Sequence, residues 1–326
     1  MKAEDVKNVS VFGAGTMGPG IAQVFAQHHY RVQLWTRSQK TLEGAKKVIR
    51  TNLETFVAHE LLEDSEVENV EDRIHCTTSL EDAARDADLI VETIIENIEE
   101  KQKLYQQLDG ICKGDTIFTS NTSFLNIFDV MPEPRLPHTV IAHWFAPPHI
   151  LPLVEIVRGP ESSDHSLTAV LDILKKAEKI PAVMDKFVPG FAINRILRIL
   201  NREVFFLLDN GYMTGEQLDI AVKASIAPRM MLLGLVQRYD FTGLDLLARN
   251  TQNKAFIEPP MDDRPHSLFS LVEKGHLGVK TGKGFYDYTD KNVEETLKER
   301  DDYLIRIFKN TDFCLKETIG KWRKED

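Results

Sequence analysis

The chain has 326 residues and a formal net charge of −10, from 40 Lys and Arg against 50 Asp and Glu. Its residues are 42% hydrophobic and 28% charged, which excludes a disordered chain; an acidic chain without a basic run is also a poor general nucleic-acid binder. At about 100–200 residues per domain, the length predicts two domains.

Neither a membrane span nor a secretion signal is expected. No apolar stretch approaches the roughly 18–20 residues needed to cross a bilayer. Residues 1–8 are charged and lead into an apolar run, without the features of a secretory signal. The cysteines Cys76, Cys112 and Cys314 are widely spaced and odd in number, so they predict neither a disulfide framework nor a metal site. We expect a soluble cytoplasmic protein.

Short β-branched runs alternate with amphipathic stretches in the first part of the chain. Residues 21–27 and 40–57, for example, have helical periodicity. This alternation is typical of a parallel sheet built from β-α-β units, so we predict an α/β Rossmann-type domain over residues 1–186. The strands are expected at residues 8–12, 30–36, 89–93, 116–120, 139–145, 153–157 and 182–184.

The pattern becomes helical over residues 187–326, the second predicted domain. In residues 188–208 apolar side chains recur with a period of about 3.6 residues. Thr214 and Gln217 have the spacing of a capping box at the start of the next helix. A charged helix with one apolar stripe is expected over residues 291–309. The fold prediction is therefore a Rossmann-type sheet domain followed by an all-α C-terminal domain.

The strongest single motif joins the first predicted strand to the first predicted helix. It reads Gly13-Ala-Gly15-Thr16-Met17-Gly18. In such a motif the first glycine makes the turn, the second lets the backbone approach a pyrophosphate, and the third lets helix and strand pack closely. Free amides at the helix N-terminus then hold the phosphates. A turn that only reverses the chain is the alternative, but its position between a strand and a helix favours a dinucleotide site.

The end of the second predicted strand bears on the choice between NAD and NADP. An NAD site has an Asp or Glu about 20 residues after the glycine motif, where it binds the ribose hydroxyl. Here Thr36, Arg37 and Ser38 occupy that place, and no acid occurs before Glu43. The guanidinium of Arg37 suits a 2′-phosphate, to which Ser38 can donate a hydrogen bond. A solvated basic turn is the alternative. The pattern favours NADP, with NAD as the alternative cofactor.

A second group of polar residues begins with Ser-Asn-Thr-Ser at residues 120–123 and continues with His143 and Glu155. A proline-rich turn joins the predicted strands that carry His143 and Glu155, and it can place the two residues opposite each other. A carboxylate beside an imidazole orients the ring and increases its basicity, so the pair is a candidate general base. A structural histidine is the alternative, and spacing does not decide between them.

Seven motifs occur in the order that one enzyme family has them, at residues 13–18, 91–97, 120–123, 143–148, 152–157, 188–195 and 280–286. Over nearly its whole length the chain therefore resembles the 3-hydroxyacyl-CoA dehydrogenase family. Within that family, the Pro-Pro-His-Ile-Leu-Pro stretch and the charged C-terminal helix are similar to the branch that acts on free hydroxy acids. That branch includes carnitine dehydrogenase, the gulonate 3-dehydrogenase related to lambda-crystallin, and a pyridoxine-degradation dehydrogenase.

The resemblance implies hydride transfer between a nicotinamide cofactor and the hydroxyl carbon of a 3-hydroxy acid or similar secondary alcohol. His143 would be the general acid/base and Glu155 its partner, while Ser123 and Asn194 would hydrogen-bond the reacting oxygen and the histidine. The resemblance also implies a homodimer formed through the helical domain, which would supply one wall of the cleft. The resemblance places Thr93, Glu96 and Lys101 on the nicotinamide-ribose side of the cofactor, and Asn121 is a further predicted cofactor-binding residue.

Departures from the family pattern bear on the substrate. Residues 56–64 stand where the family has a basic CoA-contacting helix, and they are acidic, which disfavours a phosphate-bearing CoA tail. Arg229 or Arg238 is a candidate clamp for a substrate carboxylate, although a solvated arginine is more common. An L-3-hydroxyacyl-CoA dehydrogenase is the alternative function. A non-catalytic, crystallin-like protein is the alternative of a different class, and the retained acid/base pair argues against it.

Overall fold

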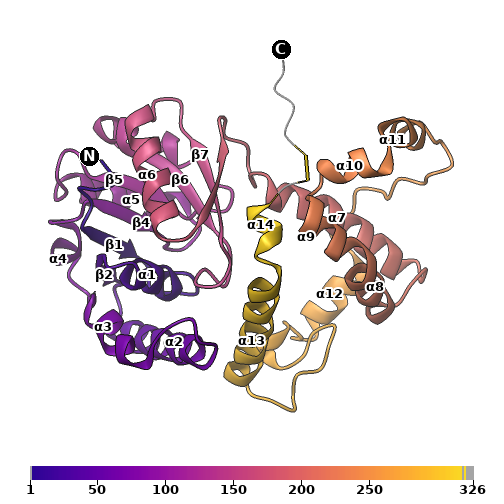
Figure 1. Cartoon of the computed structure of the whole chain (residues 1–326), viewed down its shortest axis with the longest axis horizontal. Coiled ribbons are helices and arrows are strands. Elements are labelled where there is room, and N and C mark those ends of the chain that lie inside the picture. Colours follow the sequence, from indigo (N-terminus) through magenta and orange to yellow (C-terminus); the bar gives the residue numbers. More distant parts are fainter. Residues whose placement is uncertain (1, 318, 321–326) are drawn as a thin grey trace. The chain divides into compact units, whose positions relative to one another are not determined.

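A computed structural model describes residues 2–317 and 319–320 of the chain (Figure 1). Internal contacts divide it into two compact units, Met1–Arg195 and Ile196–Asp326. The change of pattern in the sequence lies earlier, between residues 186 and 187. Of the second predicted domain, residue 318 and residues 321–326 lie outside the described residues.

The first unit is built on an eight-stranded sheet, indigo to pink in Figure 1. Its strands are β1 (Asn8–Phe12), β2 (Arg31–Trp35), β3 (Ile74–Thr77), β4 (Leu89–Glu92), β5 (Ile117–Ser120), β6 (Thr139–Trp144), β7 (Leu153–Arg158) and β8 (Ile180–Met184). Their order is β3-β2-β1-β4-β5-β6-β7-β8. All neighbours pair in parallel except β6 and β7, which are antiparallel. The chain reverses its direction across the sheet at β1 and β4, and this fold binds ligands at the carboxyl ends of the strands at such a point.

Helices cover both faces of this sheet. They are α1 (Gly18–Gln27), α2 (Gln39–Ala58), α3 (Val67–Asp72), α4 (Leu80–Ala84), α5 (Ile98–Asp109) and α6 (Asp164–Lys176). Successive strand residues point to opposite faces, so Val11 packs in the core with α1, α2, α3 and α6, and Phe12 in the core with α4 and α5. The predicted Rossmann-type arrangement is confirmed.

One strand of the sheet is absent from the sequence prediction. β3 has the sequence Ile-His-Cys-Thr and lies at the edge of the sheet, paired only with β2. Its four residues are partly or fully accessible, so it lacks the apolar run that marks a buried strand. Each of the other seven strands overlaps a predicted one.

The second unit is helical, as predicted. Its elements are α7 (Ile193–Asp209, which begins in the first unit), α8 (Gly215–Ala221), the π-helix η4 (Val222–Ile226), α9 (Ala227–Leu233), α10 (Gln237–Thr242), α11 (Leu244–Thr251), α12 (His266–Glu273), the 3-10 helix η5 (Val279–Thr281), α13 (Val293–Thr311) and α14 (Phe313–Lys316). Thr214 caps α8 by accepting a hydrogen bond from the amide of Gln217. Across the described residues, no helix has the length and apolar character of a membrane span.

Helix α7 begins at Ile193, whereas the apolar period predicts a start at residue 188. The preceding residues Gly190 and Phe191 have φ angles of 82° and 51°, both in the left-handed region. A helix cannot pass through this conformation, so the chain turns here before the helix starts. The turn buries the ring of Phe191 completely and directs the first amides of α7 toward the sheet.

Candidate active site

His143 and Glu155 face each other across β6 and β7. The two strands are antiparallel, and their register pairs these residues directly. Nδ1 of His143 lies 2.9 Å from Oε2 of Glu155, and the two residues are 4% and 1% exposed. The predicted juxtaposition is confirmed. In a buried setting the carboxylate interacts strongly with the imidazole and determines which ring nitrogen carries the proton.

The second carboxylate oxygen of Glu155 is bound by the start of α7. Its Oε1 accepts hydrogen bonds from the backbone amides of Ala192, at 3.0 Å, and Ile193, at 2.9 Å. These two hydrogen bonds fix the position of the carboxylate beside His143. Asn194 follows directly, which places this predicted site residue in the helical turn attached to Glu155. Sequence reasoning assigned no role to the two amides.

Aromatic rings enclose the imidazole of His143. The ring centroids of Phe145 and Phe191 lie 4.6 Å and 5.3 Å from that of His143, and Phe187 packs against Phe191 at 6.0 Å. These apolar neighbours limit the access of water to the histidine and lower the local dielectric constant. Nε2 of His143 has no hydrogen-bond partner among the described residues.

Asn121 joins the ends of three neighbouring strands. Its Oδ1 accepts a hydrogen bond from the Trp144 amide at 2.7 Å, and its Nδ2 donates to Oγ1 of Thr93 at 3.4 Å. The residue was predicted among the cofactor-binding set. The structure shows that its side chain holds the backbone of the residue after His143, so it also fixes the end of β6.

Glu96 organises the turn that carries Ser123. Its Oε1 accepts hydrogen bonds from the hydroxyl of Thr122 at 2.6 Å, and from the amides of Ser123 at 2.8 Å and Phe124 at 3.2 Å. Three donors on one oxygen define the path of this turn. Ser123 is half-buried there, at the carboxyl end of β5. Two of the predicted residues, Glu96 and Ser123, are therefore directly connected.

Lys101 does not present its ammonium group to solvent. Its side chain is 1% exposed, and Nζ lies 2.6 Å from Glu92 and 3.4 Å from Glu96. The residue was predicted to line the cofactor. In the structure it contacts Glu96, another of the predicted cofactor-binding residues, from the protein interior. Glu92, which binds it, was not selected from the sequence.

The glycine turn between β1 and α1 has the geometry of a dinucleotide cradle. Gly13 has a φ angle of 118°, and a Cβ there would lie 2.4 Å from the carbonyl oxygen of Thr93. A Cβ on Gly18 would lie 1.8 Å from the carbonyl oxygen of Gly13, whereas one on Gly15 would meet nothing within 4 Å. The amides of Gly15, Thr16 and Met17 have no acceptor among the described residues. These free donors beside open space fit a pyrophosphate.

The residues directly after β2 contact other parts of the domain, although the Arg37 side chain is mostly exposed. Thr36 is half-buried, and Ser38 caps α2 by accepting a hydrogen bond from the Thr41 amide at 3.3 Å. The Arg37 side chain is 74% exposed, with one guanidinium nitrogen 3.4 Å from a carboxylate oxygen of Glu100 on α5. Lys103 and, to a smaller extent, Arg37 hold the pKa of Glu100 below its ordinary value. An acid does lie near Arg37, but it comes from a distant part of the sequence.

The loop between β6 and β7 is held by a buried lysine. Lys179 is 7% exposed and donates hydrogen bonds to the carbonyl oxygens of Pro148 at 2.8 Å and Leu151 at 3.1 Å. Burial lowers the pKa of this lysine to about 8. The loop also lies against α1, because a Cβ on Gly20 would come within 2.8 Å of Pro148. Lys179 thereby fixes the segment that connects the His143 strand to the Glu155 strand.

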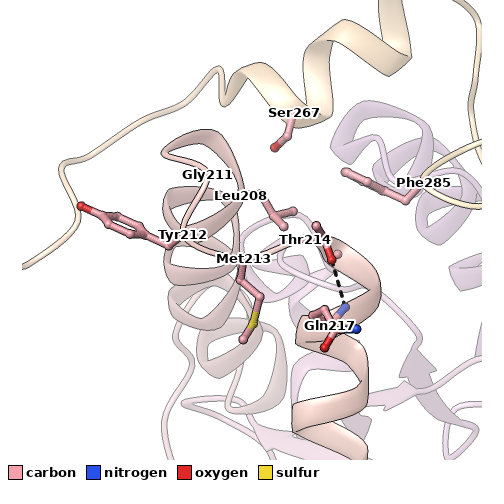
Figure 2. Close-up of a pocket in the computed structure, with 9 residues that line it drawn as sticks. Leu208, Gly211, Tyr212, Met213, Thr214, Gln217, Ser267 and Phe285 are labelled. Carbon is pink, nitrogen blue, oxygen red and sulfur yellow. Dashed lines mark hydrogen bonds between the residues drawn. The ribbon is translucent and has the colours of Figure 1, made fainter.

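The second unit has its own hollow, which Figure 2 shows with its lining side chains. It measures about 660 Å³ and lies around Tyr212, Met213 and Phe285, and no predicted site residue lines it.

Arg229, a candidate carboxylate clamp, donates hydrogen bonds to the backbone and hydroxyl oxygens of Ser225 in η4. Within the described residues, no cluster of His, Cys, Asp and Glu has the arrangement of a metal site.

Two profiles of one enzyme family match consecutive parts of the chain. The NAD binding domain of 3-hydroxyacyl-CoA dehydrogenase matches residues 8–187, and the C-terminal domain of 3-hydroxyacyl-CoA dehydrogenase matches residues 190–288. Together they cover most of the chain. The first match contains the glycine turn and the His143–Glu155 pair, and the second contains most of the helical unit.

Individual relatives match over nearly their full lengths. The 5-formyl-3-hydroxy-2-methylpyridine 4-carboxylate 5-dehydrogenase of Mesorhizobium japonicum is 28% identical over 93% of this chain and 97% of the relative. The probable 3-hydroxybutyryl-CoA dehydrogenase of Deinococcus radiodurans is 36% identical over 85% of this chain and 99% of the relative.

Solved structures agree with these relatives. A crystal structure of 5-formyl-3-hydroxy-2-methylpyridine 4-carboxylic acid 5-dehydrogenase, described as an NAD+-dependent dismutase, matches with a TM-score of 0.84. The two are 27% identical, and the match covers 94% of this chain and 99% of the other. The chain therefore belongs to the 3-hydroxyacyl-CoA dehydrogenase family and is a dehydrogenase that acts on a hydroxyl group with a nicotinamide cofactor.

Proposed function

We propose that His143 is the general acid/base of this dehydrogenase and that the substrate is a free 3-hydroxy acid or a similar secondary alcohol. The observation that carries the assignment of His143 is its 2.9 Å contact with Glu155, whose other oxygen is held by two backbone amides. A buried base that is oriented by a fixed carboxylate is suited to removing a proton from a hydroxyl group.

The chain's own residues supply orientation and proton transfer. The free amides of Gly15, Thr16 and Met17 would hold a dinucleotide, whose nicotinamide would supply the hydride acceptor. Glu155 holds Nδ1 of His143, so Nε2 takes the hydroxyl proton and returns it in the reverse reaction. The carboxylate stabilises the imidazolium that forms. Ser123 and Asn194 hydrogen-bond the reacting oxygen and the histidine in this scheme, as the family resemblance implies.

The proposed cofactor is NADP, with NAD as the alternative. The free amides of Gly15, Thr16 and Met17 support a dinucleotide of either kind. Support for NADP comes from the exposed guanidinium of Arg37 and from the lack of an acid in the residues directly after β2. Support for NAD comes from Glu100 beside Arg37, and from the relative described as NAD+-dependent.

The acidic surface near the end of α2 supports a substrate without CoA. Glu60, Glu63 and Asp64 are all exposed there. A CoA tail carries several phosphate charges, which this surface would repel. The M. japonicum relative is named for a pyridine carboxylate, which also lacks CoA. The D. radiodurans relative is named for 3-hydroxybutyryl-CoA, so an acyl-CoA substrate is the second candidate.

A substrate panel tests the proposal. We would measure kcat/KM from the absorbance of the reduced cofactor, with each of NAD and NADP. The panel contains free 3-hydroxy acids, the pyridine carboxylate for which the M. japonicum relative is named, and 3-hydroxybutyryl-CoA. We expect the highest kcat/KM with a compound that lacks CoA. A preference for the thioester would refute the substrate class alone, and no turnover with any compound would refute the catalytic role as well.

We also propose that the protein is a homodimer through its helical unit and that it is cytoplasmic. Among the described hydrophobic residues of that unit, Ile305 alone is buried, and Ile199 on α7 is 66% exposed. Such apolar faces are typical of a surface covered by another chain. Cys76, Cys112 and Cys314 are unpaired, which fits a reducing compartment. Light scattering that gives the mass of one chain would refute the dimer.

A further inference from the structure

A fully buried carboxylate lies at the carboxyl end of β4. Glu92 is 0% exposed, and its two oxygens together accept four hydrogen bonds. The donors are Nζ of Lys101 at 2.6 Å, the amide of Ile94 at 2.8 Å, and the hydroxyls of Tyr105 at 2.7 Å and Ser120 at 2.6 Å. Removing a charge from water is costly, and an apolar side chain would fill this place without that cost.

We propose that Glu92, Lys101, Tyr105 and Ser120 form a buried anchor that positions Glu96 and Ser123, and that Tyr105 is a positioning residue of the reaction. The inference rests on the function proposed above, because Ser123 is assigned there to the reacting oxygen, and Glu96 is one of the residues that the family resemblance places beside the cofactor. The four residues of the anchor come from β4, β5 and one face of α5.

The anchor reaches Glu96 through Lys101. The ammonium group of Lys101 is shared between Glu92 at 2.6 Å and Glu96 at 3.4 Å. Glu96 binds the amide of Ser123 with its other oxygen, at 2.8 Å. A displacement of Glu92 would move Lys101, and Glu96 would then lose one of the contacts that hold it against the Ser123 turn.

The anchor reaches the same turn from its other end through Ser120. The Ser120 hydroxyl donates to Glu92 at 2.6 Å and accepts a hydrogen bond from the Thr122 amide at 3.2 Å. The segment from Ser120 to Ser123 is therefore held at both ends, and each end depends on a carboxylate that contacts Lys101. This arrangement does more than fill space in the core, because it sets the path of a turn in the candidate active site.

Tyr105 provides the most selective probe of the anchor. It is 1% exposed, and burial together with the nearby Glu92 raises the pKa of its phenol well above the ordinary value, so it remains a hydrogen-bond donor at working pH. Phenylalanine has nearly the same shape but no hydroxyl. Tyr105→Phe therefore removes one donor from Glu92 and leaves the packing of α5 in place.

The chain offers a matched control for this substitution. Tyr30 is also buried, at 2% exposure, but its hydroxyl has no hydrogen-bond partner among the described residues. Tyr30→Phe removes the same atom from the same sheet domain without touching the anchor. A difference between the two variants then reports the anchor rather than the general loss of a buried hydroxyl.

The experiment measures the dissociation constant of the reduced cofactor by fluorescence, kcat with the best substrate, and the melting temperature. We expect Tyr105→Phe to weaken cofactor binding about fivefold and to lower kcat roughly tenfold, with Tyr30→Phe within about twofold of wild type. A Tyr105→Phe protein that has a lower melting temperature but wild-type binding and kcat would show that the anchor only stabilises the fold.

If Tyr105→Phe does not fold, the same measurements are made on Ser120→Ala, since this substitution removes a different hydrogen-bond donor from Glu92. Wild-type binding and kcat in that variant would likewise overturn the inference. A wild-type chain that binds neither NADH nor NADPH would overturn the proposed function and this inference together. If the wild-type chain binds cofactor and the variants keep its dissociation constant and kcat, the inference alone is overturned.

Discussion

Nδ1 of His143 and Oε2 of Glu155 lie 2.9 Å apart at directly paired positions of β6 and β7. His143 and Glu155 have different proposed roles, the base and its partner, and a single substitution can test each one. His143→Gln removes the base but keeps a polar side chain of similar size. We expect it to lower kcat at least about 100-fold while cofactor binding stays unchanged, because the imidazole acts on the hydroxyl proton. Steady-state kinetics and cofactor titration measure both quantities.

Glu155→Gln tests the partner of the histidine. The amide oxygen of glutamine can still accept the hydrogen bonds of Ala192 and Ile193, so the start of α7 should stay in place. The negative charge beside the imidazole is lost, and we expect kcat to fall about tenfold to 100-fold with little change in melting temperature. Wild-type kcat in this variant would contradict the assigned role of Glu155.

The glycines of the β1–α1 turn should respond differently to a methyl group. A Cβ on Gly18 would overlap the carbonyl oxygen of Gly13, so Gly18→Ala should lower the free energy of unfolding by at least about 2 kcal/mol. A Cβ on Gly15 meets open space, so Gly15→Ala should keep the melting temperature but weaken cofactor binding about tenfold. Equal losses of stability in both variants, measured by urea denaturation, would contradict this distinction.

Arg37 and Glu100 test the choice of cofactor. If Arg37 binds a 2′-phosphate, Arg37→Ala should weaken NADPH binding about tenfold and leave NADH binding nearly unchanged. Glu100→Gln removes the competing acid and should strengthen NADPH binding a few-fold. Paired fluorescence titrations with both cofactors measure this, and Arg85→Ala, which removes another exposed arginine but leaves Arg37 and Glu100 in place, is the control. Tighter binding of NADH to the wild type would refute the preference for NADP.

Lys179 predicts a change of stability at alkaline pH. Below pH 8 its amine is protonated in both the folded and the unfolded chain, so burial of the charge costs the folded state most there. Between pH 8 and the ordinary lysine value, the folded chain has released a proton that the unfolded chain still holds. The free energy of unfolding of the wild type, relative to Lys179→Met, should rise over this window by up to about 3 kcal/mol.

Urea denaturation at pH 7 and pH 10 measures the difference in free energy of unfolding between the wild type and Lys179→Met. Groups that titrate in the same way in both proteins do not contribute to this difference. Lys175 is the matched control, because its side chain is 63% exposed and Lys175→Met should show no such change. If the difference in free energy of unfolding between wild type and Lys179→Met is the same at both pH values, the pKa of Lys179 is not lowered by burial.

Some tertiary features leave a weak signal in the sequence. Lys101 and Tyr105 are four residues apart, so they lie on one face of α5, the face that also carries Leu104 and Leu108. A lysine on an apolar helix face predicts a buried acidic partner, and Glu92 at the end of the preceding strand is the nearest candidate. This signal would have found the buried anchor, whereas the amides that bind Glu155 belong to the backbone and have no residue type to mark them.

The sequence by itself determined the features that depend on local backbone chemistry. The glycine turn, the alternation of strands with helices and the change to a helical pattern each require particular residues at short spacing, so they are readable along the chain. Only the tertiary structure decided the contacts between distant residues, such as Arg37 with Glu100, Glu155 with the start of α7, and Glu92 with Tyr105 and Ser120. The physical reason is that strand register and helix packing set these contacts, and both depend on burial of side chains throughout the sheet domain.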